Sequence, residues 1–111
     1  MFLDLKIKKD ILIVTLKGEL DHNSAEEVRV KIDNKIDMNE VKNIILDFSG
    51  VSFMDSSGIG AVIGRYKKIS QRGGKVFVSN VNRNVDKIFE LAGLYKIIKK
   101  YKTVEEAVGC I

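Results

Sequence analysis

Two serines and two glycines lie close together in the segment Val51-Ser-Phe-Met-Asp-Ser-Ser-Gly-Ile-Gly60, just after an apolar run. These residue types allow four kinds of chemistry at Ser56 and Ser57. They could form a catalytic nucleophile, a phosphate-binding loop, a phosphorylation target or the cap of a helix. The spacing of the neighbouring residues helps to separate these four hypotheses.

Two nucleotide-binding motifs can be tested by spacing alone. Gly58, Gly60 and Gly64 form G-x-G-x-x-x-G, which is one residue longer than the dinucleotide-binding fingerprint. The lysine that a P-loop carries after its second glycine is missing. The segment therefore fits neither motif.

A serine hydrolase would need a nucleophile elbow, G-x-S-x-G, around Ser56 or Ser57. Neither serine has a glycine two places before it. The only histidine, His22, could act as the base of an Asp21–His22–Ser56 triad, although a single histidine after a strand is typical of a loop or a helix start. A small hydrolase that uses Ser56 or Ser57 with His22 is kept as an alternative hypothesis.

The same segment has the composition of a helix start. Asp55, Ser56 and Ser57 have side chains that accept hydrogen bonds from the first free amides of a helix. The three glycines that follow lower the helix propensity by about 2–3 kcal/mol relative to alanine. Close packing of the helix on a sheet would account for the second and third glycines. Gly58, beside the serines, would give a partner protein access to the helix start.

Five apolar runs predict the strands of a sheet. Residues 3–7 alternate between apolar and polar side chains, as in a half-buried strand, and residues 11–16 are almost all apolar. The polar break between these two runs predicts a hairpin. Residues 43–48 and 75–79 have the composition of parallel strands, and residues 97–98 predict a last short strand.

Residues that begin or end helices predict four helices. The starts are the capping boxes Ser24 with Glu27 and Thr103 with Glu106, and the caps Asp55 and Asn82. The ends are glycines suited to a left-handed cap: Gly73, Gly74 and Gly93. The element order ββαβαβαβα predicts an α/β fold, with a mixed and mostly parallel sheet, in a single domain over residues 1–111.

The composition favours a small cytoplasmic protein. The chain has 111 residues, of which 45% are hydrophobic and 31% are charged, and no apolar run approaches the about 18 residues of a membrane span. Asp4 and several lysines interrupt the start, unlike a secretory signal. One cysteine, Cys110, and one histidine cannot form an internal disulfide or a zinc cluster.

The net charge of +4 does not indicate a nucleic-acid-binding protein. Most of the 19 basic residues are lysines, and only 4 are arginines. Arginine is the residue whose planar fork pairs with bases and phosphates. We therefore expect a lysine-rich solvated surface and no direct nucleic-acid partner.

Three segments resemble the STAS-domain anti-sigma factor antagonists. They are SFMDSSGIG with GRYK in residues 52–67, GELDH in residues 18–22 and AGLYKII in residues 92–98. The similarity spans nearly the whole chain and agrees with the predicted element order. The resemblance implies a STAS-type domain that acts as an anti-anti-sigma factor, not as an enzyme.

The resemblance also implies a role for Ser56. In the family, the first serine of Asp-Ser-Ser-Gly is phosphorylated by an anti-sigma factor that is also a serine kinase, and a serine phosphatase resets it. The unphosphorylated protein binds the kinase and releases a sigma factor, which the resemblance indicates to be the sporulation sigma factor F. The implied partner-binding residues are Asp21, Asp55, Ser56, Ser57 and Gly58. ATP belongs to the partner kinase, and no cofactor or metal is expected here.

A phosphate suits the predicted helix start, because free amides and the helix dipole favour an anion there. The phosphorylated protein should therefore stay folded, and the added charge and bulk should act on the partner. The pathway stays open, since a STAS module of a general stress or sensor pathway would use the same switch.

Four charged residues have two interpretations each. Asp21 would repel the phosphate or touch the kinase, or it stabilises the start of the next helix. Arg65, Lys67 and Lys68 would meet an acidic partner surface, or they form a solvated helix face.

Overall fold

The computed structural model describes residues 1–111 and begins with an antiparallel hairpin. Strand β1 (Phe2–Lys8) pairs with β2 (Ile11–Leu20), from Phe2 opposite Lys17 to Lys8 opposite Ile11. Lys9 takes the left-handed conformation, with φ of 57°, that a tight turn requires. The predicted hairpin is confirmed.

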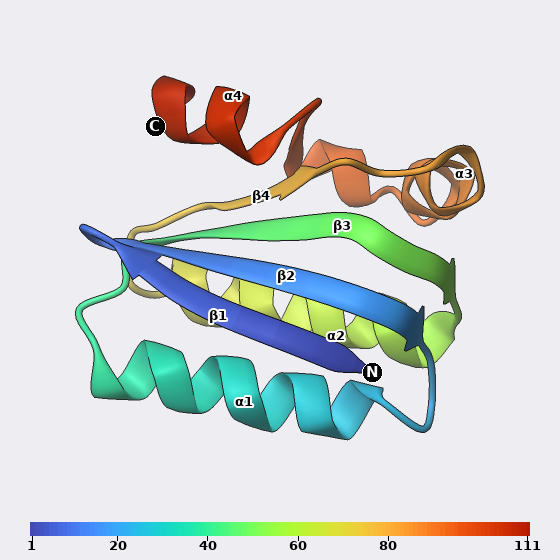
Figure 1. Cartoon of the computed structure of the whole chain (residues 1–111), viewed down its shortest axis with the longest axis horizontal. Coiled ribbons are helices and arrows are strands. Elements are labelled where there is room, and N and C mark those ends of the chain that lie inside the picture. Colours follow the sequence, from blue (N-terminus) through green and yellow to red (C-terminus); the bar gives the residue numbers. More distant parts are fainter.

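The remaining strands extend the sheet in parallel. Strands β3 (Asn43–Met54), β4 (Val76–Ser79) and β5 (Lys99–Tyr101) follow β2 in the order β1-β2-β3-β4-β5. Every pair from β2 onward is parallel. The predicted order ββαβαβαβα and the mixed, mostly parallel sheet are therefore confirmed (Figure 1).

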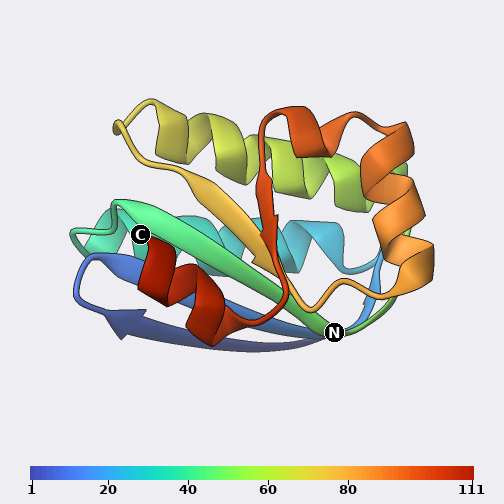
Figure 2. The ribbon, with the colours of Figure 1, turned by 90° about the horizontal axis from the view of Figure 1, so that it is seen from above.

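Helices cover both faces of this sheet. Helices α1 (Ala25–Met38) and α2 (Ser56–Ser70) lie side by side on one face, and α4 (Val104–Cys110) lies on the other (Figures 1 and 2). Helix α3 (Arg83–Leu91) and a short 3-10 turn, η1 (Leu94–Lys96), lie toward the end of the sheet that carries the carboxyl end of β3. None of these helices has both the length and the apolar character that crossing a membrane requires.

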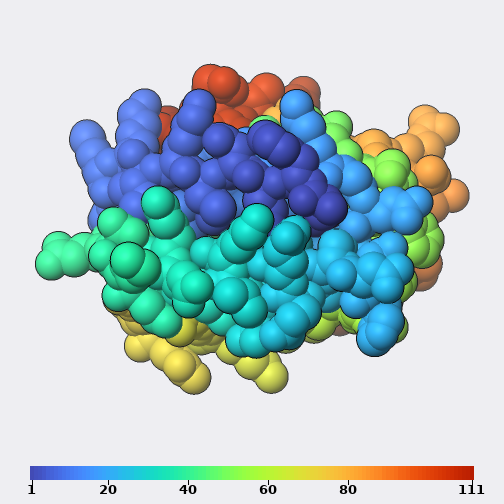
Figure 3. Space-filling model, turned by 60° about the horizontal axis from the view of Figure 1, so that its bottom comes forward, coloured from blue at the N-terminus to red at the C-terminus, as the bar shows by residue number.

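Two apolar clusters hold the layers together. The larger one joins the sheet to α1, α2 and α3, and the smaller one lies beneath α4. The stripe predicted for the first helix supplies Val28, Ile32 and Ile36, which are all buried. Figure 3 shows α1 running along the surface between β1 and α2. The amphipathic period of α1 is therefore explained by this single buried face.

Charged side chains also join α1 to α2. The Arg65 guanidinium lies 2.9 Å from Asp33, and the Lys68 ammonium lies 2.9 Å from Asp37. Arg65 is only 6% exposed, so its assignment to a solvated helix face was wrong. Burial lowers the pKa of Arg65 below its ordinary value, and the nearby Asp33 carboxylate offsets only part of this shift. Lys67 is exposed, as the surface interpretation requires.

The last strand is displaced from its predicted place. Ile97 and Ile98 do not form a strand, because both of their amides donate to the carbonyl oxygen of Leu94 in the turn after η1. Ile98 is buried, which explains its apolar character without a strand. Strand β5 instead consists of Lys99–Tyr101, whose two lysines are exposed at the sheet edge. Polar edge strands carry a weak apolar pattern.

The capping predictions succeeded at three helices and failed at one. Asp55, Asn82 and Thr103 accept hydrogen bonds from amides in the first turns of α2, α3 and α4. Ser24 makes no such bond to α1. Its hydroxyl donates to the Glu19 carbonyl at 2.7 Å and accepts from the Asp21 amide at 3.0 Å. Gly73 and Gly93 are left-handed, with φ of 77° and 73°.

Asp86 ties α3 to the last strand and predicts a pH-dependent stability. Its Oδ1 accepts hydrogen bonds from the Tyr95 hydroxyl at 2.5 Å and from the Lys100 ammonium at 2.9 Å. These bonds, that from Tyr95 most of all, hold the pKa of Asp86 below its ordinary value. The carboxylate therefore contributes stability that is complete above the unfolded pKa of about 3.9 and is lost as the pH falls through the lower folded pKa.

We expect Asp86→Asn to be less stable than the parent protein at neutral pH. The difference in free energy of unfolding should shrink below about pH 4, because the parent loses its charged partner there. Urea unfolding between about pH 7 and about pH 3 measures this difference. A difference that does not change over this range would contradict the assigned role of the carboxylate.

Candidate functional site

The candidate site lies where the carboxyl ends of β2 and β3 meet. Parallel pairing brings Leu20 opposite Met54, and the Asp55 amide donates to the Leu20 carbonyl oxygen at 3.3 Å. The two strands therefore deliver their following loops to the same edge of the sheet. One loop begins with Asp21, and the other leads directly into α2.

Asp55 links these two loops. Its Oδ1 accepts from the amides of Ser57 at 2.9 Å and Gly58 at 3.1 Å, which caps α2. Its Oδ2 accepts from the His22 amide at 3.2 Å. Partial desolvation raises the pKa of Asp55, but the three amides outweigh it and hold that pKa below the ordinary value. Asp55 is thus a carboxylate that positions the loop and the helix together.

The two serines differ in their surroundings. Ser56, the first residue of α2, is exposed, whereas Ser57 is partly buried. Ser57 lines a depression of about 180 Å³ between α1 and α2, together with Arg29, Gly60 and Arg65. Of the two hydroxyl-bearing residues, Ser56 is the one that the helix start leaves on the surface.

Gly58 has a different role from the one its position suggested. A Cβ atom at Gly58 would lie 2.2 Å from the Leu20 carbonyl oxygen and 2.6 Å from Cγ of Met54. Gly58 is buried, so its lack of a side chain lets α2 pack on the end of β2 and does not expose the helix to a partner. A Cβ atom at Gly60 or Gly64 would meet no other atom within 4 Å, so tight packing does not explain these two glycines. Both interpretations of the α2 glycines were therefore wrong.

Asp21 acts at the start of α1. Its Oδ1 accepts from the amides of Asn23 at 3.0 Å and Ser24 at 3.2 Å. The Asp21 side chain therefore closes the turn that leads into α1, whereas the sequence had predicted that Ser24 would cap this helix. Asp21 also lies beside His22, whose amide binds Asp55, so the structure brings it to the rim that carries Ser56.

The residues of the alternative hydrolase triad are not joined. No side-chain hydrogen bond connects His22 with Asp21, Ser56 or Ser57, and it is the backbone amide of His22 that donates to Asp55. The Asp21 carboxylate is directed to amides of its own loop. No three His, Cys, Asp or Glu side chains are grouped in a way that could hold a metal ion.

Phe53 is a residue of this rim that sequence reasoning missed. Its side chain is 48% exposed although it is a large aromatic in a strand. The reason is a β-bulge, since Gly18 pairs with Val51 but the next residue, Glu19, pairs with Phe53. Ser52 is skipped, and both Ser52 and Phe53 become exposed. A bulge depends on pairing between strands, so no local pattern indicated it.

Comparison with known proteins assigns the chain to a family. The STAS domain model matches residues 2–107. The chain belongs to the STAS domain family. This STAS domain is 39% identical over 99 residues to the anti-sigma F factor antagonist of Paenibacillus polymyxa, covering 89% of this chain and 85% of that one. It is 30% identical to the anti-sigma-B factor antagonist of Bacillus subtilis, covering 86% and 85% of the two chains.

A solved structure supports the same assignment. The Bacillus cell fate determinant SpoIIAA in its phosphorylated form superposes on this STAS domain with a TM-score of 0.77. The two chains are 34% identical, and the match covers 97% of each. The resemblance found in the sequence motifs is confirmed at the level of the family and of the fold.

Two glycines of α2 give a matched test of how closely the helix packs on the end of β2. We expect Gly58→Ala to lower the free energy of unfolding by about 1–3 kcal/mol, because its Cβ would overlap the Leu20 carbonyl. Gly60→Ala should raise it by up to about 1 kcal/mol, since alanine favours the helix and the position is open. Urea unfolding of the two variants measures both effects. Equal effects of the same sign would contradict the packing assigned to Gly58.

Proposed function

We propose that this STAS domain is an anti-sigma factor antagonist whose binding is switched by phosphorylation of Ser56. The observation that carries the proposal is the exposed serine at the first position of α2, in a family where a related chain has been solved in a phosphorylated form. The unphosphorylated protein binds an anti-sigma factor that is a serine kinase. A serine phosphatase removes the phosphate.

The charges around Ser56 support an electrostatic switch. Asp55 already binds the amides of Ser57 and Gly58, so these two amides are not free to bind a phosphate on Ser56. A phosphate would therefore add about −1.5 to −2 charges beside an ionised carboxylate. Asp21 precedes His22, whose amide donates to Asp55, and its own carboxylate binds amides of that loop. A partner that packs closely here would have to desolvate an additional unpaired anion, which strongly weakens binding.

The surroundings favour Ser56 over Ser57 as the phosphate acceptor. Ser57 is partly buried and faces the depression between α1 and α2, and its amide is fixed by Asp55. Ser56 has an exposed side chain at the helix start, which a kinase active site can reach without unfolding α2. Because Gly58 is buried, we assign it to the packing of the helix start and not to direct contact with the partner.

The identities to the relatives favour one of two proposed pathways. The 39% identity to an anti-sigma F factor antagonist favours release of the sporulation sigma factor F in the cytoplasm. The anti-sigma-B factor antagonist of Bacillus subtilis is less similar and represents the alternative, a stress pathway with the same switch. ATP is used by the kinase in both cases.

Phosphorylation of single-site variants tests the switch. With ATP and the anti-sigma factor kinase from the same genome, we expect the parent and Ser57→Ala to take up one phosphate. Ser56→Ala should take up none but should bind the kinase like the parent, since only a hydroxyl is lost. Ser56→Asp should bind about a hundredfold more weakly, which corresponds to about 2.8 kcal/mol. Intact-mass spectrometry and calorimetry measure the two properties.

The comparison of the two serines decides the assignment. If Ser56→Ala accepted phosphate at the parental rate, or if Ser57→Ala alone abolished it, the assignment of Ser56 would be wrong. If none of the variants or the parent bound the kinase, the proposed antagonist function itself would be wrong.

The exposed Phe53 predicts an apolar anchor for the same partner. We expect Phe53→Ala to weaken kinase binding by about thirtyfold, because aromatic anchors at interfaces contribute about 2 kcal/mol or more. Its free energy of unfolding should change little, since surface substitutions lie within about 0.5 kcal/mol. Calorimetric titration and urea unfolding provide the two measurements.

Met38→Ala is the matched control for Phe53→Ala. Met38 is 83% exposed and ends α1, the helix whose other end begins near the site. It should leave kinase binding unchanged. Equal losses of affinity in the two variants would show that Phe53 is not a specific anchor.

A further inference from the structure

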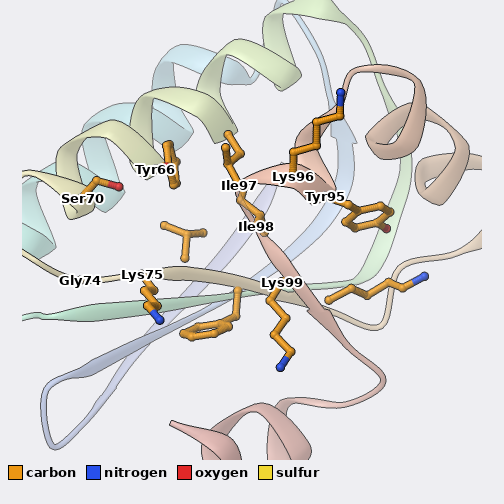
Figure 4. Close-up of a pocket in the computed structure, with 12 residues that line it drawn as sticks. Tyr66, Ser70, Gly74, Lys75, Tyr95, Lys96, Ile97, Ile98 and Lys99 are labelled. Carbon is orange, nitrogen blue, oxygen red and sulfur yellow. The ribbon is translucent and has the colours of Figure 1, made fainter.

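The largest cavity of the molecule lies far from Ser56 and Ser57, at the opposite end of α2. It has a volume of about 750 Å³ and lies between the last turns of α2, the beginning of β4 and the segment from η1 into β5 (Figure 4). Ser70, which ends α2, lines this cavity, whereas Ser56 begins the same helix. The helix has 15 residues, so about 20 Å separates its two ends. We call this cavity the lysine groove.

The centre of the lysine groove is apolar. Tyr66 extends from α2, and Ile97 faces it from the segment before β5 (Figure 4). Val76 and Ile98 complete the floor. Ile97 is 39% exposed, so its side chain is accessible from the groove. This surface can accommodate an apolar side chain of a partner.

The rim of the groove carries only positive charge. Four lysines and no acidic residue line it: Lys75, Lys96, Lys99 and Lys100. Lys100 is paired with Asp86 at 2.9 Å. The other three form no ion pair, because no carboxylate lies within 4.0 Å of their ammonium groups. Elsewhere on the chain, Arg29, Lys31 and Lys68 do have acidic partners.

The directions of these lysines indicate the kind of ligand. Lys75 and Lys99 point to one side of β4 and Lys96 points to the other, so the three ammonium groups do not converge on one point (Figure 4). A single phosphate or carboxylate is held by donors that converge on it, which these do not. Several carboxylates spread along a chain could each meet one lysine.

The open edge of β4 suits an extended chain. Strand β5 has three residues, and its pairing with β4 begins only at Phe77 opposite Lys99. Val76 therefore lies beyond the end of β5, beside the groove, whereas the amide and carbonyl of Lys75 already bond to Asn43 and Ile44 on the β3 side. An uncovered strand edge is a surface on which extended segments bind.

We propose that the lysine groove binds an extended, acidic segment of a partner protein, with one or two apolar residues at its centre. The apolar residues contact Tyr66 and Ile97, and flanking aspartates or glutamates pair with Lys75, Lys96 and Lys99. Because Ser56 lies at the other end of α2, this binding does not depend on phosphorylation. The groove would thus be a second interaction surface, additional to the proposed switch.

A peptide titration of the full chain tests this proposal. The probe is an acetylated and amidated peptide of about eight residues, roughly 26 Å when extended, with a central Leu-Phe pair flanked by Asp and Glu. We expect its addition to shift the amide NMR signals of Gly74, Val76 and Ile97 and to leave that of Ser56 unchanged. Two control peptides carry Lys in place of the acidic residues, or Ser-Ser in place of Leu-Phe, and should bind more weakly.

Charge-reversal variants separate the groove from general electrostatics. We expect the triple variant Lys75→Glu, Lys96→Glu, Lys99→Glu to bind the acidic peptide more than about tenfold more weakly, since each exposed pair contributes severalfold. The matched control reverses three exposed lysines that do not line the groove, Lys6, Lys8 and Lys67, and should lose much less affinity. Ile97→Ser tests the apolar contact, and circular dichroism checks that each variant is folded.

Several results would overturn the proposal. One is the absence of NMR shifts in the groove at millimolar peptide. Another is an equal loss of peptide affinity in the two triple variants. A third is that laurate, an apolar chain with one carboxylate, binds in the groove and the peptide does not. Ser56→Asp should bind the peptide like the parent. Peptide binding is measured without the kinase, so a negative result for the groove and a negative result for the phosphorylation switch can be told apart.

Discussion

The start of α2 rests directly on the end of β2, and the position of Ser56 depends on this contact. Only glycine fits at position 58, because the Leu20 carbonyl oxygen occupies the space of a side chain. The Asp55 carboxylate then binds the amides of both the helix and the neighbouring loop. With the helix start fixed in this way, Ser56 is held at the surface in a defined geometry and does not belong to a mobile loop.

The same arrangement determines the electrostatics of the rim. A helix start normally attracts an anion, but here Asp55 has already taken that place. A further negative charge on Ser56 would lie next to the Asp55 carboxylate. Asp55 also binds the amide of His22, the residue that follows Asp21. A phosphate on Ser56 would therefore find the two helix amides that Asp55 caps already occupied, and its charge would stay on the surface that a partner meets. Phe53, exposed by a bulge, provides apolar surface beside this charged rim.

Helix α2 connects two regions of opposite character. The Asp55 carboxylate caps its first turn, and its last turns border a groove whose unpaired charges are all positive. Between them, Arg65 and Lys68 pair with Asp33 and Asp37 of α1, which fixes the helix against its neighbour. A rigid helix that separates two chemically distinct surfaces allows each to meet its own partner.

The sequence by itself determined the element order, the hairpin, three of the four helix caps, and the serine motif at the start of α2. These depend on local periodicity and on short motifs, which act within a few residues of each other. Only the tertiary structure decided the roles of the glycines, the burial of Arg65, the exposure of Phe53 and the true position of β5. Three of these depend on an atom from a distant segment: the Leu20 carbonyl for Gly58, Asp33 for Arg65, and the paired strand for Phe53. No spacing along a single chain records such contacts.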